Sequence, residues 1–422
     1  MNNASLELGG TNWAEKDGNI LGYSVGDTSG KYSPQEFTFA RGSNLSATRI
    51  DRAGLIVKGR ENVLLQSNSL DTSPWVKLDG ATLVSGQSGY DGSLDAWRIN
   101  ITNLSNSGLY QAIPLNGVYS YSIYAKAGDI NYLGFTNFAG SNYDIFFNLS
   151  NGTIANQSGF IDATITSAGN GFYRCTLTSV NPVYLQMKPS STASNTSTAG
   201  YIFMQDLQVE LGLAASPYIE TTTTSAQAGV LENTPRLNYT TGVANPYLLL
   251  EPSRTNLVTH SENFDDSGWT KITAGTASLP VVTANYTTSP DGYQNAARIQ
   301  FASDTSSTGN YSLVNSSNIT LSSIGTATLY VKSLTSSTQN LLMYWGVGPG
   351  QVFQVTTEWT RITLSNISAS TNVLLIGTRG GVGNYFSGGD ATLDIAVWGA
   401  QLEAGTYPTS YIPTYSVSAT RA

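Results

Sequence analysis

Apolar and polar residues alternate along much of the chain with the period of two that is typical of β-strands. Residues 119–126 show this alternation, and so do residues 328–332 and 393–398. Asn-Gly and Asp-Gly turn dipeptides separate such segments at intervals of roughly 8–12 residues. No stretch keeps a 3.6-residue helical period beyond two turns. We therefore expect an all-β chain.

One order of sequence motifs occurs twice, so the chain carries two copies of one domain. Asn62 and Trp75 open the first copy, and Asn256 and Trp269 open the second. Matched blocks follow in the same order and close each copy on Gln-x-Glu-x-Gly. A period of roughly 190–200 residues is too long for a solenoid and indicates a tandem of domains. About 155 residues with eight or more short strands predict a jelly-roll β-sandwich for each copy.

The predicted organisation has four parts. A small N-terminal segment of β or extended structure covers residues 1–57, and the first jelly roll covers residues 58–220. An extended bridging segment, in which prolines bracket apolar residues, covers residues 221–254, and the second jelly roll covers residues 255–422. The second copy lacks about one strand and its turns relative to the first. If the two copies bind ligands through that region, they should not bind them alike.

Composition excludes several classes of function. The chain has 20 basic and 28 acidic residues and a net charge of −8, which argues against a nucleic-acid partner. Only 11% of its 422 residues are charged, so neutral hydroxyl and amide groups cover the surface. No apolar run approaches the length that spans a bilayer, so we expect no membrane partner. The first residues show no signal peptide, and we expect synthesis in a cytoplasm.

A single cysteine, Cys175, and a single histidine, His260, limit the chemistry further. They exclude an intrachain disulfide and a zinc site with several thiol or imidazole ligands. Cys175 aligns with Ile362 of the second copy and is expected to be an apolar core residue. His260 aligns with Gln66, which argues against an essential role shared by both copies. We expect no metal site and no cofactor, and although loop oxygens are compatible with a structural calcium ion, no spaced Asp cluster specifies one.

Glu210 and Glu403 recur inside the closing motif of each copy. A glycosidase needs two carboxylates roughly 5–9.5 Å apart, whereas each copy repeats a single Glu. We interpret both as structural carboxylates that accept backbone hydrogen bonds in a turn. The sequence thus predicts no catalytic residues and no enzyme, and a surface-glycan hydrolase that uses Glu210 or Glu403 is the least favoured class.

Several motifs resemble those of tailed-bacteriophage virion proteins. In the N-terminal and bridging segments they are residues 37–43, 46–50, 54–56, 235–239 and 246–257. The second copy also resembles the sandwich domain of that family, which is similar to a carbohydrate-binding module, in Ser261, Phe264, Trp269 and the closing residues 401–405 and 410–414. The first copy departs from the pattern, with Leu70 in place of the Phe and Val209 in place of a Leu.

The resemblance implies a structural component of a bacteriophage particle, displayed on its surface as a head fibre, a capsid decoration or a tail-associated protein. Its implied partners are further copies of the chain and other capsid or tail proteins, and its implied origin is the cytoplasm of a host bacterium. Residues 1–57 would attach it to the particle. The alternative is a carbohydrate-binding adhesin that recognises polysaccharide of the host surface or of mucus.

Aromatic side chains are the candidate carbohydrate-binding groups, because sugar C–H groups stack on aromatic rings. Trp75 and Trp269 occupy one framework position in both copies and are interpreted as core residues. Aromatic residues in segments that do not repeat are better candidates. They are Tyr110, Tyr132 and Tyr143 in the first copy and Tyr344, Trp345 and Tyr385 in the second. Trp97 is a further candidate, because Ala297 replaces it in the second copy and the framework therefore does not require it.

Overall fold

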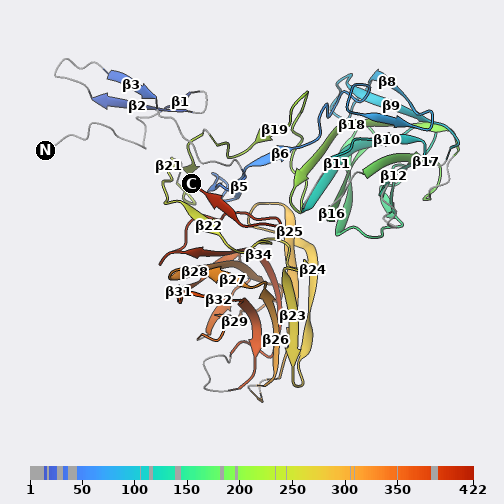
Figure 1. The fold of residues 1–422 in the computed structure, drawn as a ribbon. Coiled ribbons are helices and arrows are strands. Elements are labelled where there is room, and N and C mark those ends of the chain that lie inside the picture. The colour runs from blue at the N-terminus through green and yellow to red at the C-terminus, as the bar shows by residue number, and fades with distance from the viewer. Residues whose placement is uncertain are drawn as a thin grey trace. The chain divides into compact units, whose positions relative to one another are not determined.

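The computed structural model describes residues 14–16, 19–25, 32–36, 45–104, 106–113, 117–137, 144–180, 185–194, 198–232, 234–243, 245–304, 306–307, 309–348, 350–381 and 388–422. All regular structure in these residues is β, and every strand pair is antiparallel, so the predicted all-β class is confirmed (Figure 1). None of the described segments forms a helix able to cross a bilayer.

The chain divides into two compact units. One consists of residues 60–228, and the other combines residues 1–59 with residues 229–422. The predicted N-terminal segment and the predicted second jelly roll therefore share a unit, whereas residues 221–228 belong to the unit of the first jelly roll. We call the two layered bodies inside these units the first and the second sandwich.

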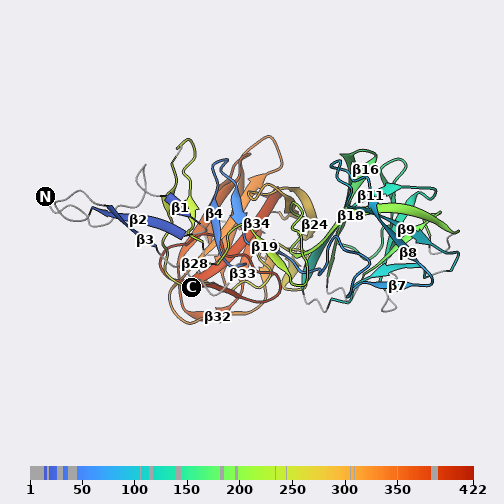
Figure 2. The same ribbon diagram turned by 90° about the horizontal axis from the view of Figure 1, so that it is seen from above.

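The first sandwich contains two six-stranded sheets. In one sheet the order is β14 (Thr153–Ala155), β13 (Asp144–Asn148), β12 (Tyr132–Asn137), β17 (Leu185–Ser190), β10 (Gly108–Tyr110) and β7 (Val76–Leu78). In the other it is β15 (Asp162–Gly169), β16 (Phe172–Val180), β11 (Val118–Ala127), β18 (Gly200–Leu211), β9 (Ala96–Ile101) and β8 (Thr82–Gln87). Both views show β16, β11, β18 and β9 side by side (Figures 1 and 2). Where the chain enters and leaves this unit, β6 (Arg60–Asn62) pairs with β19 (Ala226–Ala228).

The second sandwich contains two five-stranded sheets. One has the order β23 (Trp269–Ala274), β26 (Tyr311–Ser316), β33 (Leu374–Arg379), β29 (Gln339–Trp345) and β30 (Gln351–Val355). The other has the order β24 (Ser278–Thr288), β25 (Gln294–Ala302), β34 (Thr392–Ala404), β28 (Gly325–Ser333) and β31 (Thr360–Ile367). Two small ribbons accompany them, β27 (Ile319–Leu321) with β32 (Ser370–Asn372) and β22 (Arg254–Asn256) with β35 (Ala419–Arg421).

The repeated sequence motifs correspond to repeated strands. The five strands of each sheet in the second sandwich have counterparts, in the same order, in the first. The first sandwich adds β14 to one sheet and β15 to the other. The predicted length difference therefore amounts to two strands, one at the edge of each sheet, rather than one.

Two further segments pack on the second sandwich within its own unit. The strap (residues 45–58) carries β4 (Thr48–Ile50) and β5 (Ile56–Lys58), and the bridge (residues 229–253) carries β20 (Leu237–Asn238) and β21 (Tyr247–Leu248). The Thr48 hydroxyl donates to the Tyr411 carbonyl at 2.6 Å, and Arg236 donates to the Thr48 carbonyl at 3.3 Å. Upstream, β1 (Ala14–Lys16), β2 (Asn19–Val25) and β3 (Tyr32–Glu36) form a three-stranded meander.

Apolar side chains that alternate along the strands fill the space between the two sheets of each sandwich. Trp75 and Trp269 are buried in these cores, as predicted, and their indole N–H groups donate to the carbonyls of Gln66 and His260 at 2.9 and 2.8 Å. Cys175 is a buried core residue, and burial raises the pKa of its thiol, so its predicted role as an apolar filler is confirmed.

Candidate functional site

Three of the aromatic candidates are largely buried. Trp97 is 8% exposed inside the first core, and its indole N–H donates to the Asn68 carbonyl at 2.9 Å. Tyr344 is 2% exposed, and Trp345 is 6% exposed in the second core. A stacking platform needs an open ring face, so Trp97, Tyr344 and Trp345 all depart from the arrangement that their prediction assumed. Tyr143 and Tyr385 lie outside the described residues.

Tyr110 and Tyr132 lie on one face of the first sandwich. They pair with Gln186 and Ser190 on the shared neighbour β17, four residues apart, and this even spacing places all four on the same face. Lys188 lies between them on that face and is buried, as are Gln186 and Ser190. Burial lowers the Lys188 pKa. The structure thus brings Tyr110 and Tyr132 to one face, but the side chains of β17 that lie between them are buried and inaccessible to a ligand.

The second sandwich holds an open cleft of about 620 Å³, which we call the Trp345 cleft. It lies between the turn that follows β29 and the turn that connects β31 to β32. Trp345, Leu364 and Ile367 are its buried apolar members. The exposed members are Val347, Gln351, Ser365, Asn366, Ser368 and Ser370.

Local backbone geometry fixes the walls of the Trp345 cleft. Gly346 adopts a φ of 54°, which favours glycine, and a Cβ at this position would lie 1.9 Å from Nδ2 of Asn372 and displace that side chain. Asn366 adopts a φ of 59°, a left-handed conformation that asparagine tolerates well. The Trp345 indole N–H donates to the Ser370 hydroxyl at 2.8 Å, and this bond connects the buried floor of the cleft, Trp345, to its exposed wall at Ser370.

The chemistry of the Trp345 cleft is neutral. The described residues that line it include no Asp, Glu, Lys, Arg or His. Amide side chains offer both donors and acceptors, and serine hydroxyls do the same. An apolar floor with a few neutral hydrogen-bonding groups around it suits an uncharged ligand that carries hydroxyl groups.

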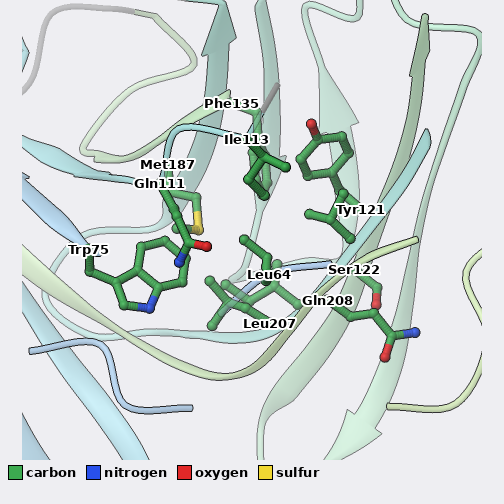
Figure 3. A pocket seen from close by; sticks show the side chains of 12 residues that line it. Leu64, Trp75, Gln111, Ile113, Tyr121, Ser122, Phe135, Met187, Leu207 and Gln208 are labelled. Carbon is green, nitrogen blue, oxygen red and sulfur yellow. The ribbon is translucent and has the colours of Figure 1, made fainter. Parts of the chain in front are cut away.

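A second cavity lies inside the first sandwich, and Figure 3 shows Trp75, Leu64 and Phe135 among the side chains around it. Its volume is about 30 Å³, which leaves room for roughly two water molecules. The amide of Gln111 already accepts from the Leu65 N–H at 2.9 Å and donates to the Leu65 carbonyl at 2.8 Å. We interpret this cavity as a void in the core rather than a ligand site.

The repeated glutamates are fully engaged in structural contacts. The Glu403 carboxylate accepts from the Thr409 N–H and from its hydroxyl, both at 2.7 Å, and Glu210 accepts equivalently from Ser216. Both side chains are buried, so the predicted role of a carboxylate that accepts backbone hydrogen bonds is confirmed. Within the described ranges, no three His, Cys, Asp or Glu side chains converge in an arrangement that could hold a metal ion.

Of the residues that line the Trp345 cleft, sequence reasoning singled out Trp345 alone. It missed Gln351, Asn366 and the serines, because nothing distinguishes one amide or hydroxyl from another in a chain so rich in them. One signal was available in the sequence. Gly346 directly follows Trp345, and a glycine turn next to a Trp that does not repeat indicates a loop with an aromatic side chain at its base.

No protein-family model matches the chain, and no curated protein matches it either. Among solved structures, the N-terminal tandem CBM22 domain from Paenibacillus barcinonensis is similar at 11% identity and a TM-score of 0.27, covering 87% of this chain and all of that one. The exo-beta-1,3-galactanase from Phanerochaete chrysosporium is similar at 11% identity and a TM-score of 0.21, over 90% of this chain and 75% of that one. Similarity this distant carries no argument about function.

Proposed function

We propose that this chain is a non-catalytic carbohydrate-binding protein and that the Trp345 cleft is a binding site for a neutral glycan. The observation that supports the proposal is the cleft itself, about 620 Å³ in volume, with an apolar floor and uncharged amide and hydroxyl walls. Pyranose rings present the matching combination of hydroxyl groups and C–H faces. The saturated hydrogen bonding of Glu210 and Glu403 favours binding without hydrolysis.

A glycan array, followed by titration of the best neutral glycan, tests this proposal. Gln351→Ala and Asn366→Gly remove one amide each from the cleft, and the glycine tolerates the positive φ. We expect each variant to bind the glycan about 5–10-fold more weakly, the value of one neutral hydrogen bond. Gln354→Ala is the control, because Gln354 is exposed on the same strand but does not line the cleft. An array without neutral hits, or variants that bind like the wild type, would contradict the proposal.

A second candidate function is that of a structural component of a bacteriophage particle, with further copies of the chain and capsid or tail proteins as partners. Its support is the sequence resemblance described above, and residues of those motifs fasten the strap and the bridge to the second sandwich. Ser46 donates to the Thr420 carbonyl at 2.8 Å, and Arg236 donates to Glu251 at 2.7 Å and to the Ser410 hydroxyl at 2.8 Å. Display on a particle and glycan binding are compatible with each other.

Mass spectrometry of purified particles tests the second candidate. The full chain should be incorporated, and a chain that begins at residue 45 should not, if the preceding residues attach it to the particle. Truncation at residue 45 keeps the strap and its contacts with the second sandwich. Incorporation of both forms would contradict the attachment role, and absence of the full chain from particles would contradict the candidate function itself.

A further inference from the structure

Strap, bridge and second sandwich enclose a second cleft, which we call the Arg49 cleft. Its volume is about 230 Å³, and all of its lining residues belong to one compact unit. The strap contributes Arg49, the bridge contributes Tyr247 and Glu251, and the sandwich contributes Tyr330 and Arg361. Unlike the Trp345 cleft, it is lined by charged groups.

In the described residues, the hydrogen bonds of the guanidinium groups in this cleft go to neutral oxygen atoms. Arg49 donates to the Leu237 carbonyl at 3.2 Å, and Arg361 donates to the Thr409 carbonyl at 2.7 Å and to the Thr328 hydroxyl at 2.9 Å. Neither arginine forms an ion pair with a carboxylate in the described part of the chain. Their positive charges are therefore not neutralised by contact.

Glu251 is the one acidic residue among the described residues that line the cleft, and it pairs with two arginines that do not line it. Glu251 lies 2.7 Å from Arg236 and 3.4 Å from Arg421, and it also accepts from the N–H and the hydroxyl of Ser410, both at 2.6 Å. Although burial opposes the change, the Ser410 hydroxyl and Arg421 lower the pKa of Glu251, so its carboxylate stays ionised. The cleft thus keeps a positive charge in a chain whose net charge is −8.

Arg361 belongs to the repeated framework, whereas Arg49 does not. Arg174 takes the place of Arg361 in the first sandwich, donates to the Ser122 hydroxyl at 3.4 Å and lies over the Tyr124 ring, as Arg361 lies over Tyr330. Arg49 and Tyr247 come from the strap and the bridge. The cleft is therefore a feature of the second sandwich unit alone.

Tyr247 provides an aromatic surface at this positive site. Its side chain is 46% exposed, and its hydroxyl accepts from the Asn238 amide at 2.6 Å, which fixes the position of the ring. A carboxylate can accept two parallel hydrogen bonds from one guanidinium, and a sugar ring can pack on an aromatic face. A sugar acid combines both groups in one residue.

We propose that the Arg49 cleft binds the carboxylate-bearing sugar of an acidic glycan, a uronate, with the carboxylate on Arg49 and the sugar ring against Tyr247. This site goes beyond the proposed function. It shares no lining residue with the Trp345 cleft, and it binds a charged rather than a neutral glycan. The two proposals can therefore fail separately.

Titration of the full chain with galacturonate hexamer tests this proposal. We expect Arg49→Gln to weaken binding at least tenfold and Tyr247→Ala to weaken it about 3–10-fold. Arg52→Gln is the matched control, since Arg52 is exposed on the same strap, loses the same charge and does not line the cleft. It should bind within twofold of the wild type. Circular dichroism and thermal unfolding confirm that each variant is folded.

Two further probes separate the sugar from its charge. The methyl-esterified hexamer has the same sugars without the carboxylates, and we expect it to bind at least tenfold more weakly. A hexaglutamate peptide has the charges without the sugars, and equal binding of this peptide would assign the site to acidic peptides and overturn the proposal. Unchanged affinity of Arg49→Gln for the galacturonate hexamer, or no binding by the wild type, would overturn it as well.

Discussion

Lys58 and Glu262, which are 204 positions apart in the chain, form a buried ion pair with 2.8 Å between Nζ and Oε1. A second carboxylate oxygen, from Asp291, lies 2.7 Å from the same nitrogen, and the Trp398 ring centroid lies 5.3 Å from it. Burial raises the pKa of Glu262. Charge therefore fixes the strap to the second sandwich in addition to backbone contacts such as the 2.9 Å bond from the Ile56 N–H to the Pro290 carbonyl.

Replacement of the buried cation should destabilise this unit strongly. Lys58→Met leaves two buried carboxylates facing each other, and removal of one partner of a buried ion pair costs about 3–5 kcal/mol. We expect a loss of this size in the free energy of unfolding of the second sandwich unit, measured with urea. Arg52→Met, at an exposed site in the same unit, should change this free energy of unfolding by less than about 0.5 kcal/mol. Equal losses for the two variants would contradict the structural role of the pair.

The buried asparagines at the start of each copy should contribute alike to the two sandwiches. Asn256 donates to the carbonyls of Ala400 and Ile412 at 3.0 and 2.8 Å and accepts from the N–H groups of Val258 and Leu402, both at 3.1 Å. Asn62 makes the equivalent four bonds in the first sandwich.

Because Ala would leave these backbone groups buried without partners, we expect Asn256→Ala to lower the free energy of unfolding of the second sandwich unit by about 3 kcal/mol. Asn62→Ala should have the same effect on the first. Differential scanning calorimetry of both variants, with the exposed Asn318→Ala as a neutral control, measures this. A loss of stability in only one sandwich would contradict an equal structural role of the two asparagines.

Asp206 should make the stability of the first sandwich depend on pH. Burial, together with the nearby charges of Asp95, Asp91 and Glu220, raises its pKa from 3.8 to about 7, although a hydrogen bond from the Tyr90 hydroxyl at 3.0 Å opposes the shift. Between these two values the folded chain holds a proton that the unfolded chain has released. The free energy of unfolding should therefore fall as the pH rises from about 4 to about 7.

Asp206→Asn removes this titration and keeps the left-handed backbone, which has a φ of 53°. We expect the variant to be more stable than the wild type at pH 8, on the order of 2 kcal/mol, because residual solvent contact screens part of the full effect. At pH 4 the two should unfold alike. Urea unfolding at both pH values measures this, with the exposed Asp71→Asn as the charge control. A variant with an unchanged pH slope would contradict the assignment to Asp206.

Much of the fold could be predicted from sequence, because it depends on local periodicity. Alternation along residues 328–332 and 393–398 marked β28 and β34, and the duplicated Asn, Trp and Glu motifs marked the two sandwiches. Trp75 and Trp269 could be assigned to the core because a framework position that repeats has to serve packing in both copies.

The sites could be predicted only in part, because they depend on contacts between distant residues. Tyr344 and Trp345 are neighbours that point to opposite faces of β29. Trp345 is buried in the core between the sheets. On the opposite face, Tyr344 is buried in a cluster with Leu313, Leu342 and Leu375. Periodicity alone does not reveal such a cluster. The Arg49 cleft likewise joins residues more than three hundred positions apart, and no local pattern could show that they meet.

Hydrogen–deuterium exchange of the full chain, with and without the best neutral glycan from the array, tests the central claim most directly. If the Trp345 cleft binds the glycan, protection should rise in the segments that form its walls, residues 345–348, 350–351 and 364–372. Protection elsewhere, with all of these segments unchanged, would contradict the account.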